Sequence, residues 1–311
     1  MLGPILFVLY TADLVALIES HGLSPHLYAD DAQVLGSCCL TNTAVLRPRM
    51  ETCIADVGGW MSSNRLQLNT SKTEVMWCSS ARRRHQVPAD CFVIGPDSVQ
   101  PIDCVRDLGL YLDTTMSMRE HISRLTSTCF GVLRQIRTIR RCLTSRARNT
   151  LVTCFVFARL DYCNSAFAGL SRCDLDRLQA VQNAAVRLVA GARKYDHVTP
   201  LLRDKHWLPV EQRIHFKIAV TVYKCLHGLS ADYLSDFTRP STASTISQRL
   251  RSADRQQLYV PRSNTRMGDR SFAVAGPSTW NRLPATVTAA PSLAVFKKQL
   301  KTFLFAEAYS V

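Results

Sequence analysis

Two adjacent carboxylates, Asp30 and Asp31, lie in the tetrapeptide Tyr28-Ala29-Asp30-Asp31. Short runs suited to β-strands flank it at 26–28 and 32–35, so the sequence predicts a hairpin with both carboxylates at its tip. Nucleotide transfer by two metal ions about 3.5–4 Å apart needs carboxylates that are held rigidly together, and such a tip holds them. The tetrapeptide alone is more typical of an ordinary Asp-rich turn, because such turns are common at hairpin tips.

Basic residues point to a polyanionic partner. The 311 residues carry 38 Lys and Arg against 24 Asp and Glu, a formal charge of +14, and Arg outnumbers Lys by 30 to 8. Arg134, Arg137, Arg140 and Arg141 recur at three- and four-residue steps beside an apolar helical stripe. Because the planar guanidinium pairs well with phosphate, we expect nucleic acid binding there. The alternative is a solvated helix face of a merely basic protein.

The cysteine pattern bears on metal and compartment. The 12 cysteines form no C-x-x-C pair, so we expect no zinc site. A chain of this length does not need a disulfide framework, so free thiols are expected in an intracellular compartment, the nucleus or the cytoplasm. The apolar opening 5–18 contains Asp13 and lacks a preceding Lys or Arg, so neither a secretory signal nor a membrane span is expected.

The elements that must position these residues alternate in the first third of the chain. Apolar periodicity predicts one helix over 4–18, ended by Gly22, and a second over 42–63. Strands are predicted at 66–68, 73–77 and 91–94, with the basic loop 82–85 before the last, and the apolar segment 108–113 closes the region. This mixture predicts an α+β fold.

The rest of the chain is predicted to be helical. Helices are expected at about 119–139, 146–167, 175–190, 210–226 and 292–305, and the Ser-, Thr- and Arg-rich stretch 239–257 is typical of a linker. Burial of large apolar groups after Asn264 predicts that this C-terminal segment docks on the helical region. Those groups are Phe272, Trp280, Leu283, Phe296 and Phe303.

Several ordered motifs carry a family resemblance. In the first third they are residues 2–7 (LGPILF), 28–31 (YADD), 64–69 (NRLQLN) with 72–74 (KTE), and 108–113 (LGLYLD). In order and spacing they resemble the palm of non-LTR retrotransposon (LINE-type) reverse transcriptases. Residues 159–165 (RLDYCNS), 178–187, 206–210 (HWLPV) and 280–284 (WNRLP) are similar to the C-terminal region of jockey-like elements.

The resemblance implies a role for each candidate. Asp30 would be a ligand of Mg²⁺, Asp31 would support that site, and Tyr28 would lie under the primer end. Lys72 is a candidate acid for the departing pyrophosphate, with a solvated loop lysine as the alternative.

The same resemblance implies the contacts to substrates. Leu108 and Gly109 begin the segment that corresponds to the primer grip, and the arginines at 134, 137, 140 and 141 would lie on the thumb. The implied partners are an RNA template, a DNA primer and a deoxynucleoside triphosphate.

The implied organisation has four parts. Residues 1–115 would be a partial palm, 116–237 a helical thumb and C-terminal helical region, 238–257 a flexible linker and 258–311 the docking segment. The family's palm also needs an Asp on an earlier strand, the fingers and a Gln-Gly before Leu2, and this chain starts after all three. We therefore expect a truncated fragment of an RNA-directed DNA polymerase that is inactive alone. The alternatives are a catalytically dead nucleic-acid-binding remnant and a helical interaction protein.

Overall fold

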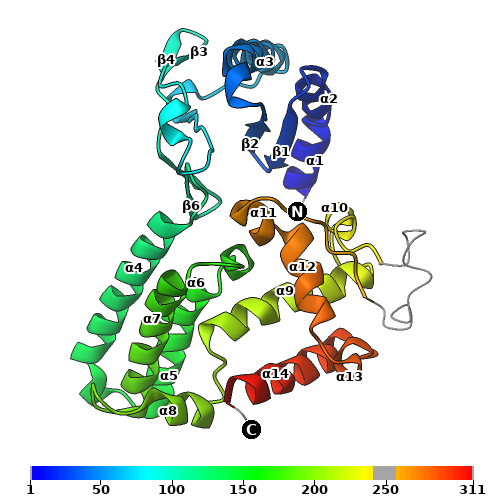
Figure 1. The fold of residues 1–311 in the computed structure, drawn as a ribbon. Coiled ribbons are helices and arrows are strands. Elements are labelled where there is room, and N and C mark those ends of the chain that lie inside the picture. The colour runs from blue at the N-terminus through cyan, green and yellow to red at the C-terminus, as the bar shows by residue number, and fades with distance from the viewer. Residues whose placement is uncertain (1, 241–256, 310–311) are drawn as a thin grey trace. The chain divides into compact units, whose positions relative to one another are not determined.

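The computed structural model describes residues 2–240 and 257–309 as two compact units, Met1–Met116 and Ser117–Val311 (Figure 1). Helices and small antiparallel sheets together make the fold α+β. The first unit contains α1 (Leu2–Tyr10), α2 (Asp13–Ser20), β1 (Ser24–Tyr28), β2 (Asp31–Leu35), α3 (Thr43–Ser63), β3 (Phe92–Ile94), β4 (Asp97–Val99), β5 (Cys104–Asp107) and β6 (Leu110–Asp113). The second contains α4 (Arg119–Thr138), α5 (Ser145–Val152), α6 (Ala158–Leu160), α7 (Arg172–Ala190), α8 (Val198–Asp204), α9 (Val210–Leu226), α10 (Asp232–Ser235), α11 (Arg266–Arg270), α12 (Phe272–Asn281), α13 (Ala285–Thr288) and α14 (Leu293–Tyr309).

The core of the first unit is small. Leu14 and Ile18 of α2 pack with Leu46, Cys53 and Val57 of α3 and with further apolar side chains of the β1–β2 hairpin. The helix predicted over 42–63 is confirmed as α3, because its apolar residues recur on the one face that meets this core.

The single helix predicted over 4–18 is wrong, because the chain breaks into α1 and α2 at Thr11 and Ala12. At the break, the amides of Ala12, Leu14 and Val15 donate to the carbonyl oxygens three residues earlier, at 3.1–3.3 Å, so tighter turns replace the α-helical pattern. Only α2 contributes buried residues. In the described part of the chain, only the helical stretch 2–20 is long and apolar enough to cross a bilayer. The core helix of a folded domain also meets these two criteria of length and composition.

Two predicted strands do not form. Residues 66–68 run without a partner strand, although their exposure alternates as in a strand. Residues 73–77 make only an isolated bridge between Val75 and Pro101. Alternating burial along a segment therefore does not make it a β-strand unless a neighbouring segment supplies the backbone hydrogen bonds of a sheet. The strand predicted at 91–94 forms as β3 and pairs with β4 in a short hairpin.

The second unit is built on α4, α7 and α9. The helix predicted over 210–226 is confirmed as α9, and those predicted near 119–139 and 175–190 are α4 and α7. The helix predicted over 146–167 is interrupted, because Thr153–Phe157 form a π-helical turn and a 3-10 turn follows at Asn164–Phe167. Within this π-helical turn, Val156 and Phe157 are buried.

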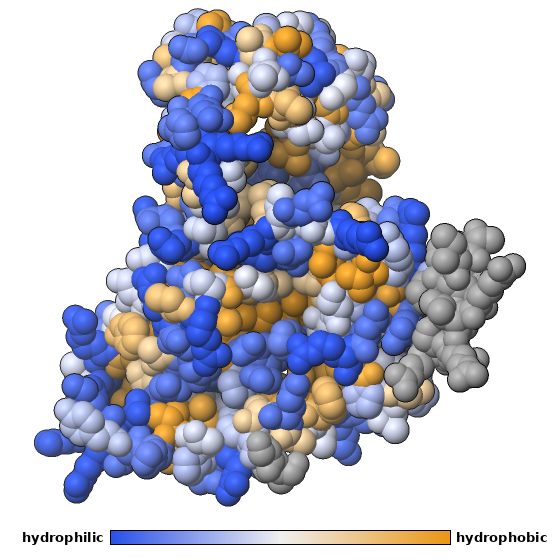
Figure 2. All heavy atoms as spheres, viewed as in Figure 1, coloured by the Kyte–Doolittle hydropathy of each residue, from blue (hydrophilic) through white to orange (hydrophobic). Residues whose placement is uncertain are grey.

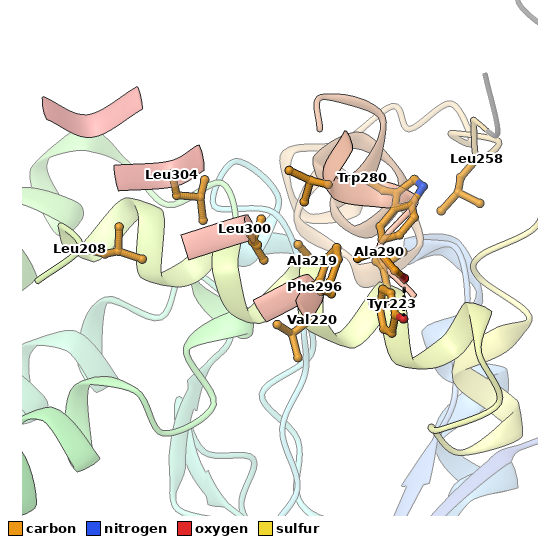
Figure 3. Close-up of a cluster of buried hydrophobic side chains, with 12 residues drawn as sticks. Leu208, Ala219, Val220, Tyr223, Leu258, Trp280, Ala290, Phe296, Leu300 and Leu304 are labelled. Carbon is orange, nitrogen blue, oxygen red and sulfur yellow. Dashed lines mark hydrogen bonds between the residues drawn. The ribbon is translucent and has the colours of Figure 1, made fainter. Parts of the chain in front are cut away.

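The C-terminal segment packs on α9 (Figure 3). Phe296 of α14 stacks on Tyr223 with ring centroids 4.4 Å apart, and the Tyr223 hydroxyl donates to the Ala290 carbonyl oxygen (3.0 Å). The five apolar residues that led us to expect docking all lie in or against this cluster. Most of the linker predicted at 238–257 lies outside the described residues.

Candidate functional site

The tetrapeptide 28–31 forms the tip of a β-hairpin whose turn has two residues. Tyr28 pairs with Asp31, so Ala29 and Asp30 are the turn, and Ala29 takes a positive φ of 54°. The prediction that both carboxylates lie at a hairpin tip is confirmed. Asp30 and Asp31 are exposed, and Tyr28 at the end of β1 is 64% exposed. The tip therefore presents three polar side chains to solvent on a short, paired scaffold.

A second two-residue hairpin carries Leu108 and Gly109. Asp107 pairs with Leu110, and Leu108 and Gly109 both have positive φ, 42° and 86°. Two positive φ values define a type I′ turn, for which Gly at the second position is well suited. The exposed Leu108 side chain projects from a tightly fixed turn.

A side-chain hydrogen bond joins the two hairpins. Gln33 of β2 donates through Nε2 to Oδ1 of Asp107 on β5 at 2.5 Å. Gln33 lies two residues after Asp31, on the same face of the strand. The bond therefore couples the hairpin that carries the carboxylates to the one that carries Leu108 and Gly109. Sequence reasoning missed this pair, since its members are 74 residues apart and neither shows a distinctive local pattern.

The residues present do not make up a complete magnesium site. No group of three His, Cys, Asp or Glu side chains in the described ranges could hold a metal ion. Mg²⁺ prefers near-octahedral oxygen coordination, and two adjacent carboxylates on an exposed turn supply only part of that.

Lys72 is exposed on the 3-10 turn Thr70–Lys72. Neither a hydrogen bond nor an ion pair connects it to Asp30 or Asp31 in the part of the chain that the structure describes. Its role as an acid therefore stays a prediction.

Four arginines form a basic stripe at one end of α4. Arg134 and Arg137 lie on its solvent face, beside the buried Leu133 and Ile136, and Arg140 and Arg141 belong to the 3-10 turn Arg140–Cys142 that follows. Figure 2 shows hydrophilic residues gathered at this end of the helix. Among the described residues none of the four pairs with an acid, whereas Arg124 is paired with Glu120 at 2.6 Å.

The motif at 159–165 serves the fold of the second unit. Both oxygens of Asp161 accept from the Arg213 guanidinium, one of them from Nε at 2.8 Å, and that guanidinium lies over the Phe157 ring, 4.7 Å from its centroid. This pair fastens the end of α6 to α9. Its members are 52 residues apart, so no sequence spacing signals it.

Comparison with known proteins supports the sequence resemblance. The chain is 27% identical over 224 residues to a protein of Drosophila melanogaster described as "Probable RNA-directed DNA polymerase from transposon BS". The match covers 69% of this chain and 24% of that relative, so the chain spans about a quarter of the relative's length. No protein-family profile matches the chain. No solved structure matches it either. The resemblance is confirmed at this level: the chain contains a region like that of non-LTR retrotransposon reverse transcriptases.

Proposed function

We propose that this chain is the part of an RNA-directed DNA polymerase that carries its catalytic hairpin and a helical region for holding template and primer. The hairpin tip 28–31 carries the proposal, because its two carboxylates lie at a tight turn between paired strands, as such a polymerase requires. The similarity of 69% of the chain to a transposon polymerase supports it. In this proposal the first unit is a partial palm and the helices from α4 onward include the thumb.

The roles of the first-unit residues follow from their placement. Asp30 and Asp31 would contribute carboxylates to a site for Mg²⁺ whose further ligands come from elsewhere. Tyr28 would support the primer end from the same tip. Leu108 and Gly109 would contact the primer from the second hairpin, and the bond from Gln33 to Asp107 would keep the two tips in register.

The arginine stripe would hold the nucleic acid backbone. Arg134, Arg137, Arg140 and Arg141 are exposed and leave four guanidinium groups available for phosphates. Contacts of this kind position a duplex without reading its sequence, which suits an enzyme that copies any template.

A salt titration tests this role. Changing all four arginines to Gln should weaken binding of an RNA–DNA hybrid and flatten its salt dependence, by about 0.9 in the logarithmic slope for each phosphate that the variant no longer neutralises. The matched control changes four exposed cations elsewhere in the second unit, Arg262, Lys297, Lys298 and Lys301, to Gln. An equal loss of affinity in the control, or an unchanged slope in the test variant, would reject the stripe. Salt-independent binding would favour a helical interaction protein instead.

A further inference from the structure

A second basic element lies in the first unit, well outside the hairpin tips. The loop between Ser79 and Cys91 carries Arg82, Arg83, Arg84 and His85, all of them exposed. Figure 2 shows projecting hydrophilic residues on the segment that leads into β3. The proposed function above gives this loop no role.

The loop is fixed at its beginning by backbone hydrogen bonds. The Ser79 amide donates to the Thr114 carbonyl oxygen beyond β6 (2.9 Å). The Arg83 amide then donates to Ser80 and the Gln86 amide to Arg83, at 2.9 and 3.0 Å, so two successive turns shape the basic residues.

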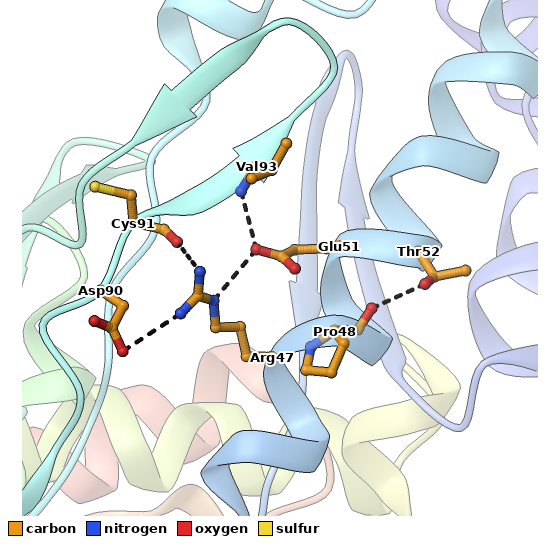
Figure 4. A network of polar contacts seen from close by, with 7 residues as sticks. All are labelled: Arg47, Pro48, Glu51, Thr52, Asp90, Cys91 and Val93. Carbon is orange, nitrogen blue, oxygen red and sulfur yellow. Dashed lines mark hydrogen bonds and ion pairs between the residues drawn. The ribbon is translucent and has the colours of Figure 1, made fainter.

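The end of the loop is fixed by Arg47 of α3 (Figure 4). Its guanidinium donates to the Cys91 carbonyl oxygen (2.5 Å) and pairs with Asp90 (3.4 Å) and Glu51 (3.3 Å). Glu51 in turn accepts from the Val93 amide at 3.0 Å. This network ties the entry to β3 onto α3, so the loop is anchored on both sides.

The acids near the loop already have partners. Asp103 pairs with Arg84 at 2.6 Å, and Asp90 is held by Arg47. Arg82 and Arg83 pair with no acid in the part of the chain that the structure describes. An anchored loop thus presents two adjacent, uncompensated guanidinium groups beside His85.

We infer that the loop 82–85 binds the phosphodiester backbone of a nucleic acid, as a contact site separate from the arginine stripe of the second unit. Guanidinium groups match phosphate in geometry and charge, and a fixed loop loses little conformational freedom on binding. Contact through phosphates alone makes the site indifferent to sequence. The choice of nucleic acid over another polyanionic surface rests on the proposed function.

The experiment compares three double variants of the full chain, together with the four-arginine variant of the arginine stripe, by fluorescence anisotropy. The probe is a labelled single-stranded RNA of mixed sequence, over a series of salt concentrations. Arg82→Gln with Arg83→Gln should weaken binding and reduce the logarithmic salt slope by about 1.4, since each contact to a single strand contributes about 0.7. The matched control, Lys297→Gln with Lys298→Gln, removes the same charge from the exposed face of α14 and should leave the slope unchanged. Arg82→Lys with Arg83→Lys should retain most of the slope, and circular dichroism of all three should be alike.

The opposing outcomes are distinct. A slope that the Gln pair leaves unchanged, or that the control lowers equally, overturns the loop site. Arg82- and Arg83-dependent sedimentation with phosphatidylserine vesicles, without an effect on RNA binding, assigns the loop to a lipid surface and also overturns it. If the four-arginine variant loses affinity while the loop variant does not, only the loop site fails. If neither variant changes RNA binding, the proposed function fails as well.

Discussion

Removing the ring of Phe296 should release the C-terminal segment from α9. Phe296 is fully buried and its ring centroid lies 4.4 Å from that of Tyr223 and 5.8 Å from that of Trp280. It thereby joins α14 to α9 and α12. Truncation of a buried Phe to Ala costs about 3–5 kcal/mol, because apolar burial is removed and a cavity is left behind. A folded domain is stable by only about 5–15 kcal/mol, so the second unit should lose a large share of its stability.

Urea denaturation and hydrogen exchange measure this effect. Phe296→Ala should lower the free energy of unfolding of the second unit by about 3–5 kcal/mol and speed amide exchange in peptides from both α9 and α14. Val295→Ala is the control, because Val295 is the preceding residue on the same helix and is 36% exposed; its effect should stay within about 0.5 kcal/mol. Equal stability of the two variants, with exchange in α9 unchanged, would show that the segment is not held by this cluster.

Two further predictions concern titration and thiol chemistry. Burial lowers the pKa of His121 and of His215 below 6.5, so the unfolded chain binds more protons than the folded chain in acid. The free energy of unfolding should therefore fall as the pH drops below about 6.5. In urea titrations at several pH values, His121→Gln should make that fall shallower. Burial raises the pKa of the Cys129 thiol to about 11, so Cys129 should resist alkylation at neutral pH while the exposed Cys142 and Cys154 react. Mass spectrometry of the modified peptides measures this difference. Rapid modification of Cys129 in the folded chain would contradict its burial.

Local signals predicted much of the scaffold. α3 and α9 were predictable because their apolar residues repeat on one face, and the hairpin tip because a tight turn separates two strand-like runs. The secondary-structure predictions failed where contacts with residues distant in the sequence determine the local structure. Residues 66–68 lack a neighbouring strand, and Thr153–Phe157 form a π-helical turn inside a stretch predicted as one helix.

The candidate site divides in the same way. Asp30 and Asp31 are adjacent, so a local motif finds them. The bond from Gln33 to Asp107 and the pair of Asp161 with Arg213 join residues far apart in the chain, so only the folded backbone brings them together. The basic loop 82–85 was visible as a charge run, but its availability for an external anion depends on which acids pair with its neighbours.

Templated DNA synthesis by residues 1–311 alone should be unmeasurable, for reasons of metal coordination. Asp107 is bonded to the hairpin through Gln33 but lies on a different strand pair, and Asp56 on α3 is paired with His21 at 3.0 Å. The described residues thus offer no third carboxylate to bridge two ions, as two-metal transfer requires.

Primer extension on an RNA template with Mg²⁺ measures this activity. Fusing family-like fingers and a first palm strand before Leu2 should restore it, and Asp30→Asn in the fused protein should abolish it again. Extension by the unfused chain that disappears on Asp30→Asn would show instead that these residues complete the site themselves. An active fusion that tolerates Asp30→Asn would remove Asp30 from the metal site altogether.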